Sequence, residues 1–239
     1  MKDGRGLYVV IAAAGIGERL GIGMYKALIK IGEKAMVQWA IEAFDEIEEV
    51  DFINVVVPYE ANIGDFECIL EGVKRGGRIG LIYGGSKRQL SVYRGVKAFE
   101  CNDDSVILVH DAARPFVSSR LIKDIINEMS REDVVVPIIP VTDTIKMLKS
   151  GYVISTLPRE EVGFVQTPQA FKFGVYKRAL EIVDIENDIF TDEASIFERA
   201  GIKVRYVEGE RSNIKITYKE DLLIAEALAK KFKQKSMRD

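Results

Sequence analysis

Histidine and cysteine are scarce in this chain. Its 239 residues include one histidine, His110, and two cysteines, Cys68 and Cys101. Two cysteines are too few for a disulfide framework or a tetrahedral cysteine site, and one histidine cannot form a histidine-rich metal site. These absences exclude disulfide-rich folds and metal centres built from cysteine or histidine.

Long apolar runs and a strong net charge are also missing. No apolar run reaches the roughly 18 residues of a membrane span, and the N-terminus lacks a signal-peptide pattern. With 34 Lys and Arg against 37 Asp and Glu, the formal net charge is -3, so no global basic field favours nucleic acid. We therefore expect a soluble cytoplasmic protein without membrane or nucleic-acid partners. A local cluster of cations can still bind a nucleotide.

Three familiar active-site signatures are absent as well. The dinucleotide fingerprint needs glycine at the sixth position of the loop that starts at Gly15, and Leu20 stands there. The Walker pattern needs Gly-Lys followed by Ser or Thr, and no such triplet occurs. A serine hydrolase would need a G-x-S-x-G elbow to work with His110, and this elbow is missing too. We therefore interpret His110 as a strand-end residue.

The chain does contain a glycine loop after an apolar run. Residues 7–14 are apolar throughout, which is typical of a strand buried on both faces. Gly15 and Gly17 then allow backbone N–H groups to approach an anion, and a following helix N-terminus favours negative charge. Arg19 and Lys26 come next, so the loop predicts a phosphate site flanked by two cations.

Strand-like and helix-like segments alternate along the rest of the chain. Apolar residues at helical spacing predict helices, and β-branched runs predict strands. The predicted strands are 7–14, 52–57, 79–83, 105–110, 134–139, 163–166, 203–207 and 212–216. The predicted helices are 35–47, 60–74, 89–99, 118–129, 173–183, 191–201 and 217–232. Thr217 and Glu220 fit a capping box at the start of the last helix. We expect one α/β domain over residues 1–239, with a Rossmann-like, mostly parallel twisted sheet and helices on both faces.

An insertion interrupts this alternation at about residues 141–160. Two strand-like pieces, 144–148 and 152–157, flank the turn Lys149-Ser150-Gly151. Because an isolated two-stranded hairpin is marginal in water, we expect this arm to pack against a second subunit.

Three polar turns follow predicted parallel strands, at residues 15–19, 84–88 and 110–115. Ligands bind at the carboxyl ends of such strands, so these turns should line one crevice. Nucleotidyl transfer depends on positioning and on cations that neutralise charge at the α-phosphate, a task that suits Arg19, Lys26 and Lys215. Asp111 could hold ribose hydroxyls or a magnesium ion that is bound mostly by phosphate oxygens.

A set of short motifs, in order over about residues 7–228, closely resembles the 2-C-methyl-D-erythritol 4-phosphate cytidylyltransferase family. The motifs are Ala13-Ala14-Gly15-Ile16-Gly17-Glu18-Arg19-Leu20, Lys26, Gly84-Gly85 with Arg88 and Ser91, His110-Asp111-Ala112-Ala113-Arg114-Pro115, Asp143-Thr144-Ile145-Lys146, Thr167-Pro168-Gln169, Thr191-Asp192-Glu193-Ala194-Ser195 and Asn213-Ile214-Lys215. The chain differs from the usual pattern at Tyr25, where the family has proline, at Ser86, where many members are acidic, and at Leu157-Pro158 before Arg159.

The resemblance implies cytidylyl transfer from CTP to methylerythritol phosphate, with release of pyrophosphate, a divalent metal such as Mg²⁺, and a nucleotide-diphospho-sugar transferase-like fold. It assigns transition-state stabilisation to Arg19 and Lys26 and substrate positioning to Arg159 and Lys215. The implied nucleotide contacts are Ala13, Ala14, Gly15, Gly17, Gly85, Ser86, Arg88, Ser91 and Asp111, of which Asp111 is also the implied metal ligand. The implied substrate contacts are Arg114, Thr144, Arg159, Thr191 and Lys215. It also implies a homodimer in which the arm reaches the partner's site.

Two alternatives remain open. A ribitol 5-phosphate cytidylyltransferase would share the loop and much of the architecture, although Ala113 and the run Asp192–Ser195 favour the methylerythritol family. A non-catalytic nucleotide-binding dimer is the alternative of another class, against which Arg19 and Lys26 argue. A turnover assay distinguishes them.

Overall fold

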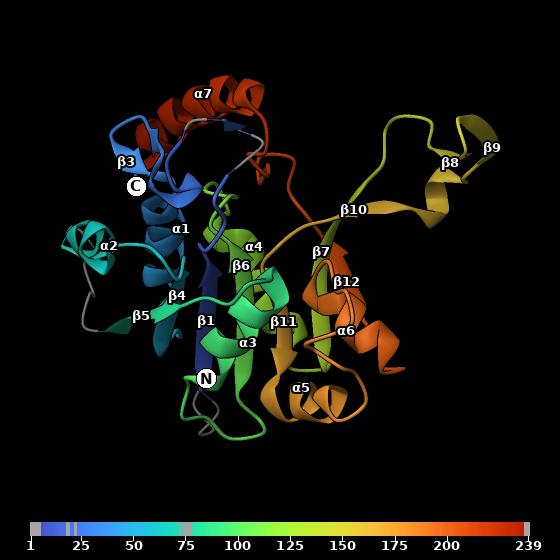
Figure 1. The fold of residues 1–239 in the computed structure, drawn as a ribbon, viewed down its shortest axis with the longest axis horizontal. Coiled ribbons are helices and arrows are strands. Elements are labelled where there is room, and N and C mark those ends of the chain that lie inside the picture. The colour runs from blue at the N-terminus through green and yellow to red at the C-terminus, as the bar shows by residue number, and fades with distance from the viewer. Residues whose placement is uncertain (1–5, 18–19, 22, 72, 74–77, 237–239) are drawn as a thin grey trace.

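A computed structural model describes residues 6–17, 20–21, 23–71, 73 and 78–236. Its centre is an eight-stranded sheet with the order β10-β7-β11-β6-β1-β4-β5, in which β12 also pairs with β7 (Figure 1). The strands are β1 (Leu7–Ala12), β4 (Phe52–Val57), β5 (Ile79–Tyr83), β6 (Val106–Asp111), β7 (Val134–Pro140), β10 (Gly163–Val165), β11 (Gln169–Lys172) and β12 (Arg205–Glu208). The predicted α/β class is therefore confirmed.

Four neighbouring strands are parallel and fix where the site lies. β1 pairs in parallel with β6 on one side and β4 on the other, and β4 pairs with β5. The register places Ala12 at the end of β1 beside Asp111 at the end of β6. The loops that leave these strands therefore emerge along the same edge of the sheet.

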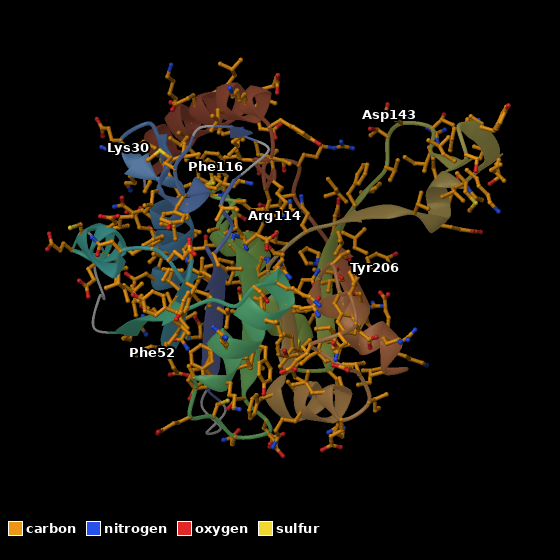
Figure 2. The ribbon with its side chains drawn as sticks, in the orientation of Figure 1. Lys30, Phe52, Arg114, Phe116, Asp143 and Tyr206 are labelled. Carbon is orange, nitrogen blue, oxygen red and sulfur yellow. The ribbon has the colours of Figure 1, made fainter. Side chains whose placement is uncertain are left out.

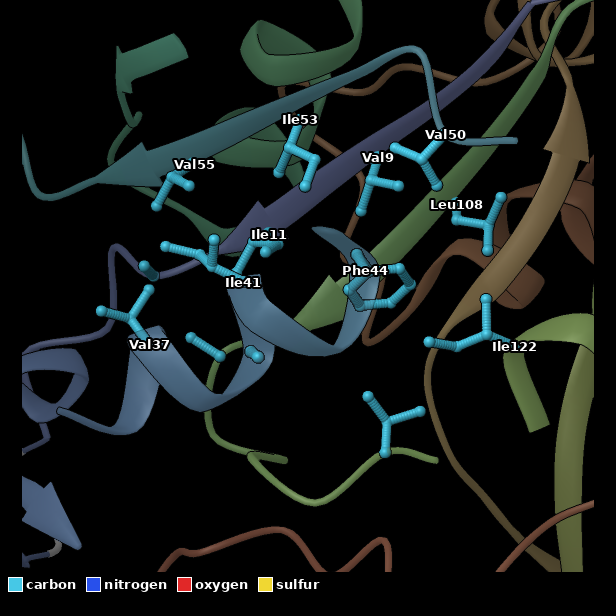
Figure 3. Packing of buried hydrophobic residues seen from close by; sticks show 14 of the residues in the cluster. Val9, Ile11, Val37, Ile41, Phe44, Val50, Ile53, Val55, Leu108 and Ile122 are labelled. Carbon is cyan, nitrogen blue, oxygen red and sulfur yellow. The ribbon is translucent and has the colours of Figure 1, made fainter. Parts of the chain in front are cut away.

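Helices cover both faces of the sheet, as the sequence predicts. One face packs against α1 (Met36–Asp45), α2 (Ile63–Leu70) and α4 (Ser119–Glu128), and the other against α3 (Arg88–Lys97), α5 (Phe173–Leu180) and α6 (Glu193–Arg199). Side chains of a strand alternate between faces, so Val9 and Ile11 join the first cluster while Val10 joins the second. Figure 3 shows Ile41 and Phe44 of α1 packed against the strand residues of the first cluster.

The C-terminal helix α7 (Lys219–Ser236) closes a third, smaller cluster. It packs with the short strand β2 (Lys30–Ile31), which pairs with β3 (Lys34–Ala35), and with Phe116, whose ring lies 5.4 Å from that of Phe232. The predicted capping box is wrong, because Asp221 and not Glu220 accepts hydrogen bonds from the N–H groups of Thr217 and Tyr218. A carboxylate one position further along satisfies these donors equally well.

The inserted arm is present as a two-stranded hairpin of β8 (Lys146–Lys149) and β9 (Tyr152–Thr156). Ser150 and Gly151 have positive φ angles of 50° and 84°, which suit a tight hairpin turn. Every residue of both strands is exposed, and the arm extends away from the body of the molecule (Figure 1). The division of the chain into a single domain with this arm stays a prediction.

Two strand predictions differ from the structure. Residues 212–216 form no strand, because Asn213 uses its side chain to bind the segment of Gln166 and Thr167, while Ile216 donates its N–H to Ala113. The sequence also missed β11, which lies antiparallel between β6 and β7. Four residues are too short for their alternation to stand out.

Several predicted helices are shorter in the structure. α2 begins after Asn62, whose side chain accepts a hydrogen bond from Gly64 and caps the helix, so the predicted start at residue 60 is wrong. α5 ends at Leu180 and α6 at Arg199. Gly201, which follows the C-cap residue Ala200, has a φ of +72°, the left-handed conformation that commonly ends a helix. Among the helices that the structure describes, none is long and apolar enough to cross a membrane.

Candidate active site

The three polar turns meet in one cleft of about 690 Å³ at the carboxyl ends of the parallel strands. The loop after β1 forms one wall, the glycine turn after β5 another, and the end of β6 the floor between them. The prediction that these turns line one crevice is confirmed.

Most of the predicted site residues line this cleft. They are Ala13, Ala14, Gly15, Gly17, Lys26, Gly85, Ser86, Arg88, Ser91, Asp111 and Lys215. Arg114, Thr144, Arg159 and Thr191 are not among its lining residues. Arg19 lies outside the described residues.

Gly17 connects the glycine loop to Lys26. Its φ is +72°, a conformation that L side chains rarely adopt, and a Cβ on it would lie only 3.0 Å from Cβ of Lys26. Tyr25 precedes Lys26 with φ of -59°, which falls within the range that proline imposes. The backbone before Lys26 thus has a proline-like conformation although the residue is tyrosine.

The glycine turn after β5 packs directly on the first loop. A Cβ on Gly84 would lie 2.9 Å from Cβ of Ala14 and 2.7 Å from Oγ of Ser91, so only glycine fits there. The N–H of Gly85 donates to Ser91 Oγ at 3.0 Å, and the same hydroxyl lies 3.1 Å from the carbonyl of Lys87. Ser91 therefore braces the turn from the first helical residues behind it.

Asp111 is the central charge of the cleft floor. Its Oδ1 accepts from Nε and Nη2 of Arg88 at 3.0 and 2.9 Å, and its Oδ2 accepts from Nζ of Lys215 at 2.6 Å. Burial alone would raise the pKa of Asp111, but the charges of Arg88 and Lys215 hold it well below its usual range. Asp111 is therefore ionised at neutral pH.

Glu193 holds the other side of Arg88. At the first residue of α6, its two carboxylate oxygens accept from Nη1 at 2.8 Å and from Nη2 at 3.1 Å. Glu193 is 1% exposed, and burial raises its pKa while the charge of Arg88 opposes that rise. The sequence places Glu193 in a family motif and in a predicted helix but gives it no role, and no local pattern could reveal a partner 105 positions away.

His110 forms part of the support beneath Asp111 and is fully buried. Its Nε2 lies 2.9 Å from the carbonyl oxygen of Arg114, which only accepts, so Nε2 carries the proton. Nδ1 then accepts from the hydroxyl of Thr167 at 3.1 Å, and that hydroxyl accepts from the N–H of Asp111. Burial lowers the pKa of His110 to about 4, so the ring is neutral and structural.

The segment that carries Lys215 is fixed by buried amides. Asn213, with no exposed surface, donates to the carbonyl of Thr167 at 2.8 Å, and Gln166 donates to the carbonyls of Glu210 and Asn213. Arg114 donates to the carbonyls of Asn213 at 2.8 Å and of Val165 at 3.2 Å. Arg114 thus holds backbone in this structure, and Gln166 is a support that the sequence did not indicate.

The remaining predicted residues lie on the arm and at the start of α6. Arg159 is exposed and donates to the carbonyl of Thr142 at 3.1 Å, and Thr144 and Thr191 are exposed as well. Figure 2 shows Asp143, next to Thr144, on the segment that leads into the arm and away from Arg114. Within one chain, the arm does not reach the cleft.

The donor set fits a metal that is held mainly by a nucleotide. Among the described residues no group of three His, Cys, Asp or Glu side chains could hold a metal ion. Among the residues that the structure describes, the carboxylates that line the cleft are Glu60 and Asp111, and both oxygens of Asp111 have cationic partners. Mg²⁺ requires few protein ligands when phosphate oxygens supply the rest, so Asp111 is the residue that would hold it.

A model of the family described as 2-C-methyl-D-erythritol 4-phosphate cytidylyltransferase matches residues 7–231. The chain belongs to this family. Among named members, the 2-C-methyl-D-erythritol 4-phosphate cytidylyltransferase of Geotalea uraniireducens is 37% identical over 225 residues, which cover 92% of this chain and 95% of that protein. The one of Caldicellulosiruptor bescii is 36% identical over 224 residues, or 93% and 96% of the two chains.

Solved structures of the 2-C-methyl-D-erythritol 4-phosphate cytidylyltransferase family share the fold. The 4-diphosphocytidyl-2C-methyl-D-erythritol synthase of Anaerococcus prevotii superposes with a TM-score of 0.80 at 31% identity, covering 95% of this chain and 97% of that one. The 2-C-methyl-D-erythritol 4-phosphate cytidylyltransferase of Thermus thermophilus gives a TM-score of 0.75 at 31% identity, with 93% and 98% covered. The resemblance seen in the sequence motifs is therefore confirmed over nearly the whole chain.

Proposed function

We propose that this protein transfers a cytidylyl group from CTP to the phosphate of 2-C-methyl-D-erythritol 4-phosphate. An oxygen of the acceptor phosphate attacks the α-phosphorus of CTP, the bond from that phosphorus to the bridging oxygen of the β-phosphate breaks, and pyrophosphate leaves. The observation that carries the proposal is the convergence of Lys26, Lys215 and Asp111 in one cleft of a chain that belongs to this family.

The glycine loop suits the triphosphate. Gly15 and Gly17 expose backbone near Lys26, and a preorganised cation there lowers the free energy of a transition state in which charge grows on phosphate oxygens. Arg19 is assigned to the same task from the sequence. Ala13, Ala14, Gly85, Ser86 and Ser91 form the walls that we assign to the cytidine, and we assign Thr191 and Arg114 to the acceptor.

In this proposal the Lys215–Asp111 pair opens during the reaction. A ribose hydroxyl or Mg²⁺ that takes the place of Lys215 at Oδ2 of Asp111 would free the ammonium group for the acceptor phosphate. Bound Mg²⁺ would neutralise phosphate charge. Exchange of one cation for another at Asp111 would thus couple nucleotide binding to the placement of the acceptor.

The arm supports a homodimer. Its exposed side chains include Leu148, Tyr152, Val153 and Ile154, each more than half exposed. Such an apolar hairpin is stable only when something covers it, and we propose that a second copy does. Thr144 and Arg159 would then act in the partner's cleft, which accounts for their distance from the cleft of their own chain.

The proposal is tested by measuring pyrophosphate release with CTP and Mg²⁺, with methylerythritol 4-phosphate and ribitol 5-phosphate as acceptors. ATP and UTP are the control nucleotides. Preference for CTP and methylerythritol phosphate is expected. Preference for ribitol phosphate would keep the chemistry and overturn the acceptor, and CTP binding without turnover on either acceptor would favour a non-catalytic nucleotide-binding dimer.

A further inference from the structure

Glu193 is a buried carboxylate that reaches the cleft only through Arg88, and the proposed mechanism leaves it without a role. It is the first residue of α6, is 1% exposed, and directs both oxygens at the guanidinium of Arg88. A buried carboxylate costs free energy unless it is paired, and removal of one partner of a buried pair is strongly destabilising. The buried charge of Glu193 is therefore expected to have a role beside Arg88.

Arg88 is held by carboxylates from two elements at once. It donates Nε–H and one Nη2–H to Asp111, and the other Nη2–H and one Nη1–H to Glu193. Four of the five guanidinium N–H groups are thus occupied. Because Asp111 and Glu193 hold the guanidinium group of Arg88 from two sides, Arg88 keeps Oδ1 of Asp111 in place. Oδ2 of Asp111 pairs with Lys215.

The charges in this chain of contacts alternate from the interior to the cleft. Glu193 pairs with Arg88, Arg88 with Asp111, and Asp111 with Lys215. Because Glu193 takes half of the guanidinium, Arg88 does not neutralise Asp111 by itself. Asp111 therefore keeps negative charge for a ligand in the cleft, which would not be so if Arg88 had no other partner.

The start of α6 is anchored well enough to serve as a fixed point. The amide of Gln169 donates to Asp192 at 2.9 Å and accepts from the N–H of Ala194 at 2.9 Å, so it holds the residues on both sides of Glu193. Gln89, next to Arg88, donates to the carbonyls of Ile185 and Asp188 and so holds α3 to the segment before α6. These contacts leave Glu193 and Arg88 little freedom to separate.

We propose that Glu193 is a positioning residue for the nucleotide, acting through Arg88 to hold the carboxylate of Asp111 in its place and to preserve its charge. The inference rests on the proposed function, in which Asp111 contacts the ribose or the metal of bound CTP. Glu193 itself contacts neither. Its effect therefore depends entirely on Arg88.

The test compares Glu193→Gln with the wild type by calorimetric titration with CTP and Mg²⁺ in the absence of acceptor. Glutamine has the same size but lacks the charge, so Arg88 shifts toward Asp111 alone, and we expect a dissociation constant for CTP about tenfold higher. Glu198→Gln is the matched control, because it makes the same change at an exposed position of α6. It should alter the constant less than twofold.

A double-mutant cycle that combines Glu193→Gln with Arg88→Lys distinguishes an effect of Glu193 through Arg88 from a general loss of protein stability. Lysine keeps the charge but cannot span two carboxylates, so in this background Glu193→Gln should change CTP affinity less than twofold. Glu193→Asp keeps the charge on a shorter side chain and should cost about threefold. If the glutamine variant does not fold, the CTP affinity of Glu193→Asp provides the test instead.

Three outcomes would count against the inference. Unchanged CTP affinity in Glu193→Gln would overturn it, and so would a tenfold effect that persists in Arg88→Lys, since Glu193 would then act by another route. Both results leave the proposed function intact if the wild type turns over CTP. A wild-type protein that neither binds nor turns over CTP would overturn the inference and the proposed function together.

Discussion

Nζ of Lys215 lies 2.6 Å from Oδ2 of Asp111, although the two residues are 104 positions apart. The pair holds a cation at the floor of the cleft. The same oxygen belongs to the carboxylate that we assign to the ribose or the metal. In the proposed mechanism, the bound nucleotide takes the place of Lys215 at this oxygen.

Replacement of Lys215 with alanine should lower kcat/KM for cytidylyl transfer by roughly 10²–10³, the usual effect of losing one preorganised charge-stabilising group. Initial rates of pyrophosphate release measure it. Lys203→Ala, which removes an exposed lysine outside the cleft, is the control and should leave the rate unchanged. A Lys215→Ala enzyme with a normal rate would exclude Lys215 from the reaction.

A second prediction concerns the arm and is that two inactive variants recover activity when they are mixed. Lys26→Ala disables the cleft of its own chain, and Arg159→Ala disables the arm that we expect to serve the partner. In a mixed dimer, one of the two clefts would combine an intact Lys26 with an intact arm from the partner. Each mixed dimer should therefore have up to about half of the activity of a wild-type dimer, and the activity of the mixture should rise in proportion to the fraction of mixed dimers. Activity is measured against the mixed-dimer fraction from native mass spectrometry. Mixed dimers without activity would contradict a shared site.

The sequence located the cleft because its turns follow parallel strands. The ends of β1, β5 and β6 each carry a polar turn, and parallel strands bring such turns to the same edge. Side-chain roles within the turns were harder to predict. Ser91 lines the cleft as predicted, but its hydroxyl braces the turn at Gly85, a contact that depends on the geometry of the turn and not on residue type.

Contacts between distant segments account for what the sequence could not indicate. Glu193 meets Arg88 across 105 positions, and Gln166 meets Asn213 across 47. Neither pair produces a periodic pattern. The sequence did not predict β11 for a related reason. Its place between β6 and β7 comes from antiparallel pairing, and its four residues show no clear alternation of apolar and polar side chains.

A third prediction concerns the packing of α3 on the sheet. A Cβ on Gly95 would lie 2.7 Å from Cγ2 of Val56 and 2.8 Å from Cγ1 of Val10, so the helix approaches the sheet more closely than alanine permits. Gly95→Ala should lower the free energy of unfolding by roughly 1–3 kcal/mol, as overpacking does. Urea denaturation measures it.

Gly64→Ala is the matched control for that substitution. It places the same methyl group in another helix, where the nearest atom is Asn62 Oδ1 at 3.4 Å. Because alanine is the better helix former, this variant should be as stable as the wild type or slightly more stable. Equal loss of stability in both variants would show that helical glycine itself matters, and not the close approach of α3.

The last prediction uses the single histidine. Burial, which outweighs the hydrogen bond to Arg114 and the charge of Asp111, lowers the pKa of His110 to about 4 from an ordinary 6.5. Between these values the unfolded chain binds a proton that the native protein does not. The contribution of His110 to stability is therefore complete above pH 6.5 and decreases as the pH falls toward 4, by about 3 kcal/mol in all.

Two measurements check this pH dependence. Because the chain has one histidine, its imidazole gives one set of NMR signals, and their titration midpoint should lie near pH 4. The side chain of glutamine carries an NH2 group that donates and a carbonyl oxygen that accepts, so His110→Gln should keep the contacts to Arg114 and Thr167 and lose the titration. Stability measured by urea denaturation should then fall less between pH 7 and pH 4.5 in the variant than in the wild type. A midpoint near 6.5, or parallel pH profiles in the two proteins, would show that the ring is not held neutral by its burial beneath Asp111.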